Sequence, residues 1–338
     1  MMKDGLPLIT AVIPTRGRPD LVVRSVRSAL NQTYPNVEAV VVVDGADPAT
    51  VEALEALAEP RLRVVALVEN AGGSEARNIG VRAARGTWVA MLDDDDEWLP
   101  TKLARQMAAV SDVNPRHCLI ACRCLQRKPG HADIVAPRRL PREHEDISEY
   151  MFYSGVDGLR HTCGPQTSGY LATRELFLDV PFTKGLKCHQ DWDWYLRAMH
   201  NSTTVATMLE EPLYIMSVET ERPHVTQLQT WQYSLSWIES RKELFTPRAY
   251  RSFLINECMH RCEETTGRLR IFKKLIALCR KTGRLNAGEV TAAMKWYFFR
   301  PTTRMRLIRG CKRMLTGIGV TPVKRKLETR TAKQEVLG

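Results

Sequence analysis

The sequence predicts an α/β fold, with a mostly parallel sheet flanked by helices and a helical, basic region after it. Three observations lead to this prediction. Short apolar runs alternate with segments of helical spacing through the first hundred residues, polar or turn-forming residues follow the runs, and Lys and Arg gather after residue 267. Alternating strands and helices with short connections build parallel sheets with right-handed crossovers.

The expected strands are short runs rich in Val, Ile, Leu and Ala that end at turn-forming or acidic segments. They are Leu8–Ile13, Val37–Val43, Leu62–Leu67 and Thr87–Leu92. The segments between the strands carry apolar residues at helical spacing. They are residues 20–33, 51–57 and 75–84.

Polar segments follow three of these strands, namely Pro14–Arg18, Asp44–Asp47 and Asp93–Asp96. Ligands of open parallel sheets bind outside the carboxyl ends of the strands. We therefore expect these segments to meet in one crevice. Later in the chain the pattern is less regular. We expect a loop over 127–146, a strand over 167–173 and helices over 191–199 and 231–245.

The composition narrows the class of protein. Of 338 residues 44% are hydrophobic, which is typical of a globular chain and excludes a disordered or collagen-like one. No apolar run approaches the roughly 18–20 residues that span a bilayer. The first residues lack the features of a signal peptide, so we expect a cytoplasmic protein. The nine cysteines have neither a disulfide framework nor the paired spacing of common zinc sites, which favours buried thiols.

The net charge of +11 is unevenly distributed. Residues 268–330 hold 18 Lys and Arg against 2 acidic residues, whereas residues 1–267 hold 30 basic and 35 acidic residues. The basic region also has apolar stripes at helical spacing, at Leu269, Phe272, Ile276 and Cys279 and again at Leu307, Cys311, Met314, Leu315 and Ile318. Three explanations remain open: contact with an anionic membrane surface, contact with nucleic acid, or packing on the rest of the chain. Nucleic acid is the least favoured, because residues 1–267 show no nucleic-acid-binding motif.

Four consecutive aspartates, Asp93–Asp96, follow the strand over 87–92. Their mutual repulsion is unfavourable unless a positive group lies among them. A divalent cation such as Mg²⁺ or Mn²⁺ takes oxygen ligands and completes its shell with substrate phosphates. The alternative is an acidic loop that caps the helix that follows. The residues alone support both interpretations.

The stretch from Pro7 to about Met107 resembles glycosyltransferase family 2, whose members have the GT-A fold. Five pieces carry the resemblance, in the same order as in that family. They are Ala11-Val-Ile-Pro-Thr-Arg-Gly-Arg-Pro, Ser28-Ala-Leu-Asn-Gln-Thr-Tyr-Pro, Val41-Val-Val-Asp-Gly, Asn70-Ala-Gly-Gly-Ser-Glu-Ala-Arg-Asn-Ile-Gly and Met91-Leu-Asp-Asp-Asp-Asp-Glu-Trp-Leu-Pro. The last piece resembles the Asp-x-Asp metal motif. The resemblance implies a GT-A domain over 1–215, with a nucleotide-sugar-binding half over 1–110 and an acceptor half over 111–215, before a helical, basic region over 216–338.

The resemblance also implies roles for individual residues on the donor side. Pro14, Thr15 and Arg16 belong to the loop that lies against the base and ribose. Asp44 resembles the carboxylate that binds the nucleotide base; its other role is to cap the turn before Gly45. Arg77 resembles an arginine that contacts the donor, and its alternative is a salt bridge on the helix surface.

The same resemblance assigns the acidic turn. Asp93 or Asp94 would face the ribose or a metal-bound water. Asp95, with Asp93, would hold Mn²⁺ or Mg²⁺ on the diphosphate of the donor. The metal offsets charge on the departing nucleoside diphosphate.

Asp191 resembles the general base of the family, the carboxylate that takes the acceptor proton during inverting transfer. The chain has Gln190 where Glu is frequent, which alters any assistance from a neighbouring acid. Helix capping is the alternative role for Asp191. Asp193 is a rival carboxylate, but its spacing to Arg197 favours an i,i+4 ion pair on the protein surface.

Weaker candidates border this element. The aromatic side chains of Trp192, Trp194 and Tyr195 are favoured as core. His161 and His189 are favoured as solvated or hydrogen-bonded.

The resulting function is metal-dependent, inverting transfer of a sugar from a nucleotide sugar to an acceptor hydroxyl, in polysaccharide, glycolipid or natural-product assembly. A UDP-sugar is the leading donor, and GDP- and dTDP-sugars remain open. The alternatives are a sugar-nucleotide nucleotidyltransferase and a non-catalytic protein that binds membrane or nucleic acid. A basic region on an anionic membrane would make the cytoplasmic protein peripheral to the inner face of that membrane.

Overall fold

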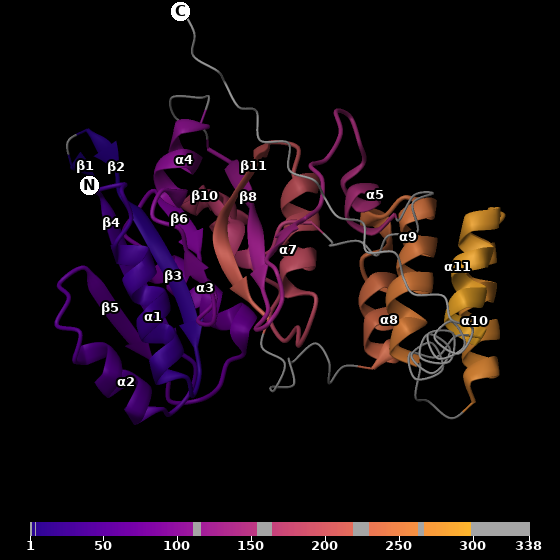
Figure 1. Cartoon of the computed structure of the whole chain (residues 1–338), viewed down its shortest axis with the longest axis horizontal. Coiled ribbons are helices and arrows are strands. Elements are labelled where there is room, and N and C mark those ends of the chain that lie inside the picture. The colour runs from indigo at the N-terminus through magenta and orange to yellow at the C-terminus, as the bar shows by residue number, and fades with distance from the viewer. Residues whose placement is uncertain are drawn as a thin grey trace, which may run out of the picture.

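The computed structural model describes residues 2–3, 5–110, 116–153, 164–218, 230–262 and 267–298 (Figure 1). A mixed sheet runs through the first two thirds of the chain, in the strand order β5-β4-β3-β6-β10-β8-β11-β7, with β9 paired to β8. Its strands are β3 (Ile9–Thr15), β4 (Val37–Val43), β5 (Leu62–Ala66), β6 (Trp88–Met91), β7 (Glu97–Trp98), β8 (Cys118–Arg127), β9 (Ile134–Ala136), β10 (Leu171–Thr173) and β11 (Val205–Ser217). A short antiparallel pair precedes it, β1 (Met2–Lys3) and β2 (Leu6–Pro7).

Helices cover both faces of the sheet and continue beyond it (Figure 1). They are α1 (Pro19–Leu30), α2 (Pro48–Glu55), α3 (Gly73–Ala83), α4 (Lys102–Ala108), α5 (Ile147–Phe152), α6 (Arg174–Asp179), α7 (Gln190–His200), α8 (Trp231–Glu239), α9 (Pro247–Phe253), α10 (Arg268–Lys281) and α11 (Ala287–Phe298). The shorter helical turns are η1 (Thr167–Gly169), η3 (Lys242–Leu244), η4 (Leu254–Cys258) and η5 (His260–Cys262).

The first half of the chain confirms the predicted α/β order. Strands β3, β4, β5 and β6 are mutually parallel, and every residue of β4 is buried. Alternate side chains of β4 enter different clusters, Val41 and Val43 on the face of α1, and Val40 and Val42 on the face of α3. A strand that is buried on both faces has a continuous run of apolar residues, and this run made β4 predictable from the sequence.

Helix α3 lies unusually close to the sheet. A Cβ atom on Gly80 would overlap Cγ1 of Val12 in β3. Glycine at this position therefore lets α3 approach the sheet, and α3 carries Arg77 one turn earlier. This close approach fixes the height of Arg77 above the strand ends.

The second half departs from the sequence predictions in three places. Residues 127–146 are not all loop, because β8 ends at Arg127 and β9 pairs with it. Within the predicted strand over 167–173, the first three residues form η1 and only β10 is a strand. The predicted helix over 231–245 ends at Glu239, and η3 follows.

The long parallel pair β8–β11 was not predicted. Its register shifts between Leu209 and Tyr214, around Pro212. Proline is tolerated in a strand at such an irregularity, but it interrupts the pattern by which a strand is recognised. The structure therefore adds β8 and β11 to the part of the sheet beyond β10.

The helices α8 and α9 share one hydrophobic cluster with α7 and the sheet. The cluster includes Trp194 of α7, Trp237 of α8 and Phe253 of α9. Of the first predicted stripe in the basic region, Cys279 is buried and Leu269 is 49% exposed. The second stripe, from Leu307 to Ile318, lies outside the described residues. None of the described helices is both long and apolar enough to cross a membrane.

Candidate active site

The three polar segments predicted to meet do so at the carboxyl ends of β3, β4 and β6. The hydroxyl of Thr15, the last residue of β3, donates to Oδ2 of Asp94 at 2.8 Å. The backbone N–H of Gly17 donates to Oδ2 of Asp47 at 2.7 Å. The predicted convergence of the three segments is therefore present, with residues 15–17 in contact with both Asp47 and Asp94.

The four aspartates of the acidic turn, Asp93–Asp96, alternate between accessible and buried positions. The side chains of Asp93 and Asp95 are 33% and 30% exposed, whereas Asp94 and Asp96 are buried. Asp96 accepts hydrogen bonds from Ser168 Oγ at 2.6 Å and from the backbone N–H of Ser217 at 3.3 Å. Burial raises the pKa of the Asp96 carboxyl well above its usual range. Asp96 is thus an anchor between the turn and the acceptor half.

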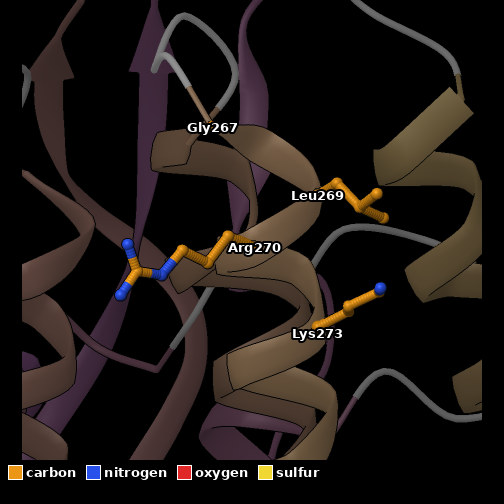
Figure 2. Close-up of a pocket in the computed structure, with 4 residues that line it drawn as sticks. All are labelled: Gly267, Leu269, Arg270 and Lys273. Atoms are coloured by element: carbon orange, nitrogen blue, oxygen red, sulfur yellow. The ribbon is translucent and has the colours of Figure 1, made fainter.

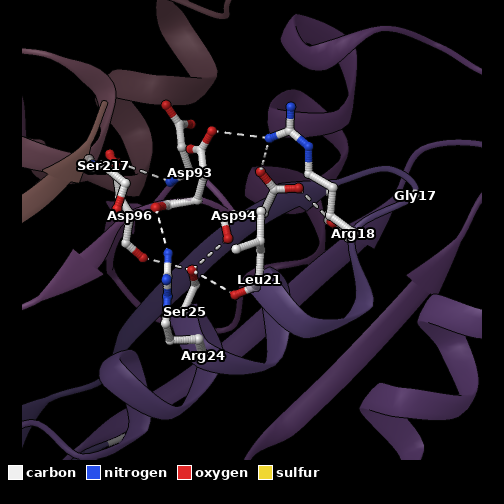
Figure 3. A network of polar contacts seen from close by, with 12 residues as sticks. Gly17, Arg18, Leu21, Arg24, Ser25, Asp93, Asp94, Asp96 and Ser217 are labelled. Carbon is white, nitrogen blue, oxygen red and sulfur yellow. Dashed lines mark hydrogen bonds and ion pairs between the residues drawn. The ribbon is translucent and has the colours of Figure 1, made fainter. Parts of the chain in front are cut away.

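Asp94 faces the loop after β3 (Figure 3). Its Oδ1 accepts from Arg18 Nη1 at 2.8 Å, and its Oδ2 accepts from Thr15. Burial raises the pKa of Asp94 to about 6, and Arg18 acts in the opposite direction. The structure therefore places Asp94 among protein partners beneath the crevice, with Asp93 and Asp95 on the accessible side.

The carboxylates of Asp93 and Asp95 fit a hard divalent cation. Both present oxygen atoms from one turn on the accessible side of the site, and Mg²⁺ or Mn²⁺ takes one or two carboxylates together with substrate phosphates and water. Across the described ranges, no three His, Cys, Asp or Glu side chains form a ready cluster for a metal ion. Within the described residues, the carboxylates of Asp93 and Asp95 are thus the oxygen ligands that this turn would offer to a cation.

Asp44 lies at the end of β4 and is buried. Its Oδ1 accepts from the backbone N–H of Ala71 at 2.6 Å, and its Oδ2 accepts from that of Gly72 at 3.0 Å. It therefore shapes the turn that leads into α3, where Gly72 has a φ of 84°. A carboxylate offers about four acceptor sites, so Asp44 keeps capacity for a ligand.

The end of β3 and the loop that follows it present their residues in different ways. Pro14 is half-buried, Thr15 is buried, and Arg16 is exposed. Arg18, which sequence reasoning missed, contacts both Asp94 and Asp95. Arg18 could have been identified from the sequence, because it is a basic residue in a loop that is expected to meet four acidic residues.

Arg77 joins the two halves of the domain. Its Nη2 donates to Asp93 Oδ1 at 2.5 Å, and its Nη1 donates to Gln190 Oε1 at 2.7 Å. The guanidinium is mostly buried and lies 5.5 Å from the centre of the Phe182 ring. Arg77 thus forms a salt bridge, as one of the two sequence alternatives proposed, but it does so inside the site.

Gln190 has a structural reason to be an amide. Its Oε1 accepts from Arg77 while its Nε2 donates to the backbone oxygen of Leu186 at 2.6 Å. An ionised glutamate could accept from Arg77 but could not donate to Leu186. The amide therefore holds Arg77 without adding a second negative charge beside Asp191.

Asp191 lies in the first turn of α7, next to Gln190. Burial raises the pKa of its carboxyl to about 6; the backbone N–H of Trp192 and the Arg77 guanidinium lower it, and Asp93 raises it. The N-cap residue of α7 is His189 rather than Asp191, and it makes no side-chain capping hydrogen bond. A carboxylate whose pKa is close to neutrality is well matched to general base catalysis.

The residues around Asp191 are structural. His189 is buried, its Nε2 lies 2.9 Å from Ser234 Oγ, and burial lowers its pKa to about 3. Trp194 and Tyr195 are core residues, and Trp192 packs at the edge of the same cluster. His161 lies outside the described residues.

Asp193 pairs with Arg197, as its spacing predicts, but inside the protein. The carboxylate is fully buried and also accepts from Thr183 Oγ1 at 2.6 Å, Arg241 Nε at 2.7 Å and Trp237 Nε1 at 3.1 Å. Two of these donors come from α8 or the residues that follow it. Asp193 therefore ties the helix of Asp191 to the C-terminal helices.

Comparison with known proteins agrees with this geometry. The model of the family "Glycosyl transferase family 2" matches residues 10–134. The succinoglycan biosynthesis protein ExoO of Rhizobium meliloti is 42% identical over 104 residues, which cover 31% of this chain and 30% of ExoO. The amylovoran biosynthesis glycosyltransferase AmsB of Erwinia amylovora is 27% identical over 255 residues, covering 72% of this chain and 82% of AmsB. The chain thus aligns with less than a third of ExoO but with most of AmsB.

Two solved structures share the fold. Residues 1–349 of S. aureus TarS, in complex with UDP-GlcNAc, superpose with a TM-score of 0.56 at 14% identity, covering 86% of this chain and 90% of the other. The mannosyltransferase PcManGT from Pyrobaculum calidifontis, in complex with GDP-Man and Mn²⁺, has a TM-score of 0.55 at 17% identity, covering 93% and 87%. These likenesses establish the GT-A fold predicted from the sequence.

Proposed function

Because residues 10–134 match the model of glycosyltransferase family 2, we propose that this chain transfers a sugar from a nucleotide sugar to an acceptor hydroxyl, with inversion and with help from Mn²⁺ or Mg²⁺. One observation supports this proposal above the others. Arg77 contacts both Asp93 of the acidic turn and Gln190 at the start of α7. This contact brings the proposed donor site and the proposed base Asp191 to one side of the sheet.

Each residue then has a defined task. Asp44 and the loop of Pro14, Thr15 and Arg16 hold the nucleoside, and Asp44 keeps acceptor capacity for the base. The ionised carboxylate of Asp191 takes the proton of the acceptor hydroxyl. Inversion requires that this hydroxyl approach the sugar from the side opposite the departing diphosphate.

The acidic turn serves the leaving group. Asp95 would hold the metal together with Asp93, both being accessible carboxylates. When bound, a divalent cation stabilises the charge that develops on the departing nucleoside diphosphate. Arg77 holds Asp93 in place and adds a fixed positive charge at the same side of the site.

The acceptor and donor follow from the relatives. ExoO and AmsB are named for the biosynthesis of succinoglycan and amylovoran, so we propose that this chain also acts in polysaccharide assembly. A UDP-sugar remains the leading donor. A GDP-sugar is the second candidate, because PcManGT shares the fold and was solved with GDP-Man.

The decisive experiment supplies a panel of UDP-, GDP- and dTDP-sugars with Mn²⁺ and measures the nucleotide product. We expect release of nucleoside diphosphate, and we expect Asp95→Ala to lower it by about 10²–10³-fold, since the leaving group then loses its metal. An exposed acid far from the turn, as in Glu175→Ala, serves as the control. Release of pyrophosphate would support a nucleotidyltransferase instead, and no product from any donor would support a binding protein.

We also propose that the basic region contacts an anionic membrane surface. The cationic side chains of Arg270 and Lys273 are exposed on α10, near exposed Leu269. With Gly267 they line a pocket at the N-terminal end of α10 (Figure 2). Val290 and Met294 of α11 are also exposed, at 44% and 43%. Basic and apolar side chains together favour an interface of headgroups and acyl chains.

Flotation with phosphatidylserine-containing liposomes tests this contact. We expect the variant R270E/K273E to lose most of its binding, because each basic residue near an anionic surface contributes about 1 kcal/mol. The matched control is R27E/R85E, which reverses two exposed charges on other elements. Equal binding of the native chain and R270E/K273E would support mere packing of the basic region. Binding only to liposomes without anionic lipid would also contradict the proposal.

A further inference from the structure

Arg18 forms an ion pair with two aspartates of the acidic turn. Its Nη1 lies 2.8 Å from Asp94 Oδ1 and 3.1 Å from Asp95 Oδ2 (Figure 3). In the described part of the chain, both partners of the Arg18 guanidinium are aspartates. The side chain is 33% exposed, so it stands at the mouth of the site. A positive group therefore already contacts the carboxylate that the proposed metal requires.

We propose that Arg18 is an internal counter-cation of the acidic turn. It neutralises Asp95 while the site holds no divalent cation, and it releases Asp95 when the cation arrives together with the donor diphosphate. This inference rests on the proposed function, because it takes Asp95 and Asp93 as the metal-binding carboxylates. It adds a residue and a binding order to that function.

Repulsion explains why the cation alone would bind poorly. A divalent cation at Asp95 would face the guanidinium of Arg18 across one carboxylate, and like charges at short range repel strongly outside bulk water. Binding the cation therefore requires breaking the Arg18–Asp95 contact. A diphosphate changes this balance, because its oxygens accept from an arginine and coordinate the cation at the same time.

The anchor of Arg18 keeps it available after release. Asp94 is buried and is also held by Thr15, at 2.8 Å. Arg18 can leave the accessible Asp95 while its Nη1 remains bonded to Asp94 Oδ1. The N–H groups of Arg18 that this releases then lie beside the acidic turn. Phosphate oxygens that coordinate a metal on Asp95 would lie at the same place.

Arg77 differs from Arg18 in this respect. It is mostly buried and is held from the other side by Gln190, so it is fixed in position beside Asp93. The second partner of Arg18 is Asp94, which belongs to the same acidic turn, and the Arg18 side chain is about three times as exposed as that of Arg77. Arg77 is thus a fixed support for Asp93, whereas Arg18 is a positive charge that can be displaced from Asp95.

Cation and diphosphate should therefore bind cooperatively. The diphosphate would accept the Arg18 guanidinium that repels the cation, and the cation would offset the negative charge of the diphosphate. Such coupling is reciprocal by thermodynamic necessity. In the native chain we expect Mn²⁺ to bind weakly alone and at least about tenfold more tightly with UDP present. Removing the charge of Arg18 should strengthen binding of Mn²⁺ alone and reduce this coupling.

The experiment measures Mn²⁺ binding to the full chain without a sugar, by the EPR signal of free Mn²⁺, with and without UDP. The test variant is Arg18→Met, which keeps the length of the side chain and removes the charge. We expect it to bind Mn²⁺ alone about tenfold more tightly than the native chain. The matched control is Arg27→Met, which removes an exposed charge from the last turn of α1. Arg18→Lys keeps a positive charge and should behave more like the native chain.

The outcomes separate this inference from the function on which it rests. If Arg18→Met and Arg27→Met change Mn²⁺ affinity equally, Arg18 is not a displaceable counter-cation and the inference is wrong. If Asp95→Ala binds Mn²⁺ as well as the native chain, the proposed metal site itself is wrong. Thermal melting would reveal whether Arg18→Met fails to fold. In that case Arg18→Lys and the coupling between Mn²⁺ and UDP binding in the native chain provide the test. If UDP does not strengthen Mn²⁺ binding to the native chain, the inference is wrong.

Discussion

We expect Asp191→Asn to lower kcat by about 10²–10⁴-fold while the affinity for the nucleotide changes little, because asparagine keeps the shape of the side chain but cannot accept a proton. The donor-side contacts of Arg77 with Asp93 and Gln190 do not involve the Asp191 carboxylate and should persist. The rate of nucleoside diphosphate release with acceptor present measures the first effect. Calorimetric titration with UDP measures the second. Normal turnover by Asp191→Asn would contradict the assignment of the base.

The pH dependence follows from the same carboxylate. Burial raises the pKa of Asp191 to about 6, so the base is protonated and inactive below that pH and ionised above it. We expect kcat/KM to rise about tenfold per pH unit up to about pH 6 and then to level off. The pKa of Asp94 is also about 6, so a further variant must show which carboxyl causes the pH dependence. Gln190→Glu adds a carboxylate beside Asp191, which should raise the pKa of Asp191. The rise in kcat/KM should then occur at higher pH.

The second large effect concerns stability. We expect Asp193→Ala to lower the free energy of unfolding by about 3–5 kcal/mol, because the buried guanidinium contacts of Arg197 and Arg241 then lose their counter-charge. Urea unfolding monitored by tryptophan fluorescence measures the loss. Asp133→Ala, which breaks an exposed ion pair with Arg127, is the matched control and should cost less. Equal losses for the two variants would contradict the role given to Asp193.

The stability that Asp193 contributes depends on pH. Burial alone would raise the pKa of Asp193, but Arg197, Thr183 and Arg241 together lower it below its usual range. A lowered carboxyl pKa contributes stability above the pKa of the unfolded chain, near 4, and loses it as the pH falls through the folded value. Asp193→Ala should therefore differ from the native chain most at neutral pH and least in acid.

The donor side of the fold was predictable because its signals are local. A strand such as Val37–Val43 is apolar throughout, and the acid that matters follows it directly at Asp44. Parallel strands bring such ends together, so Thr15 and Asp94 meet although they are 79 residues apart in sequence. The fold class, the family and the crevice followed from those features.

The acceptor side was less predictable because its contacts are distant and its strands irregular. Pro212 breaks the pattern of β11, and no local signal links Asp193 to Arg241. The alternation within the acidic turn was also hidden, since four identical residues give no indication of which are buried. Only packing distinguishes Asp94 and Asp96, which are held by protein hydroxyls, from Asp93 and Asp95.

The hold of α8 on the segment before α7 has a consequence for synthesis. The hydroxyl of Tyr233 accepts from the backbone N–H of Lys187 at 2.8 Å, Ser234 contacts His189, and Arg241 contacts Asp193. A ribosome makes the chain from its N-terminus, so the donor half exists before any of these partners. Helix α7 gains these contacts only once the chain has grown past residue 241. A nascent or prematurely terminated chain can therefore contain the acidic turn while Asp191, the proposed base, still lacks the support of α8.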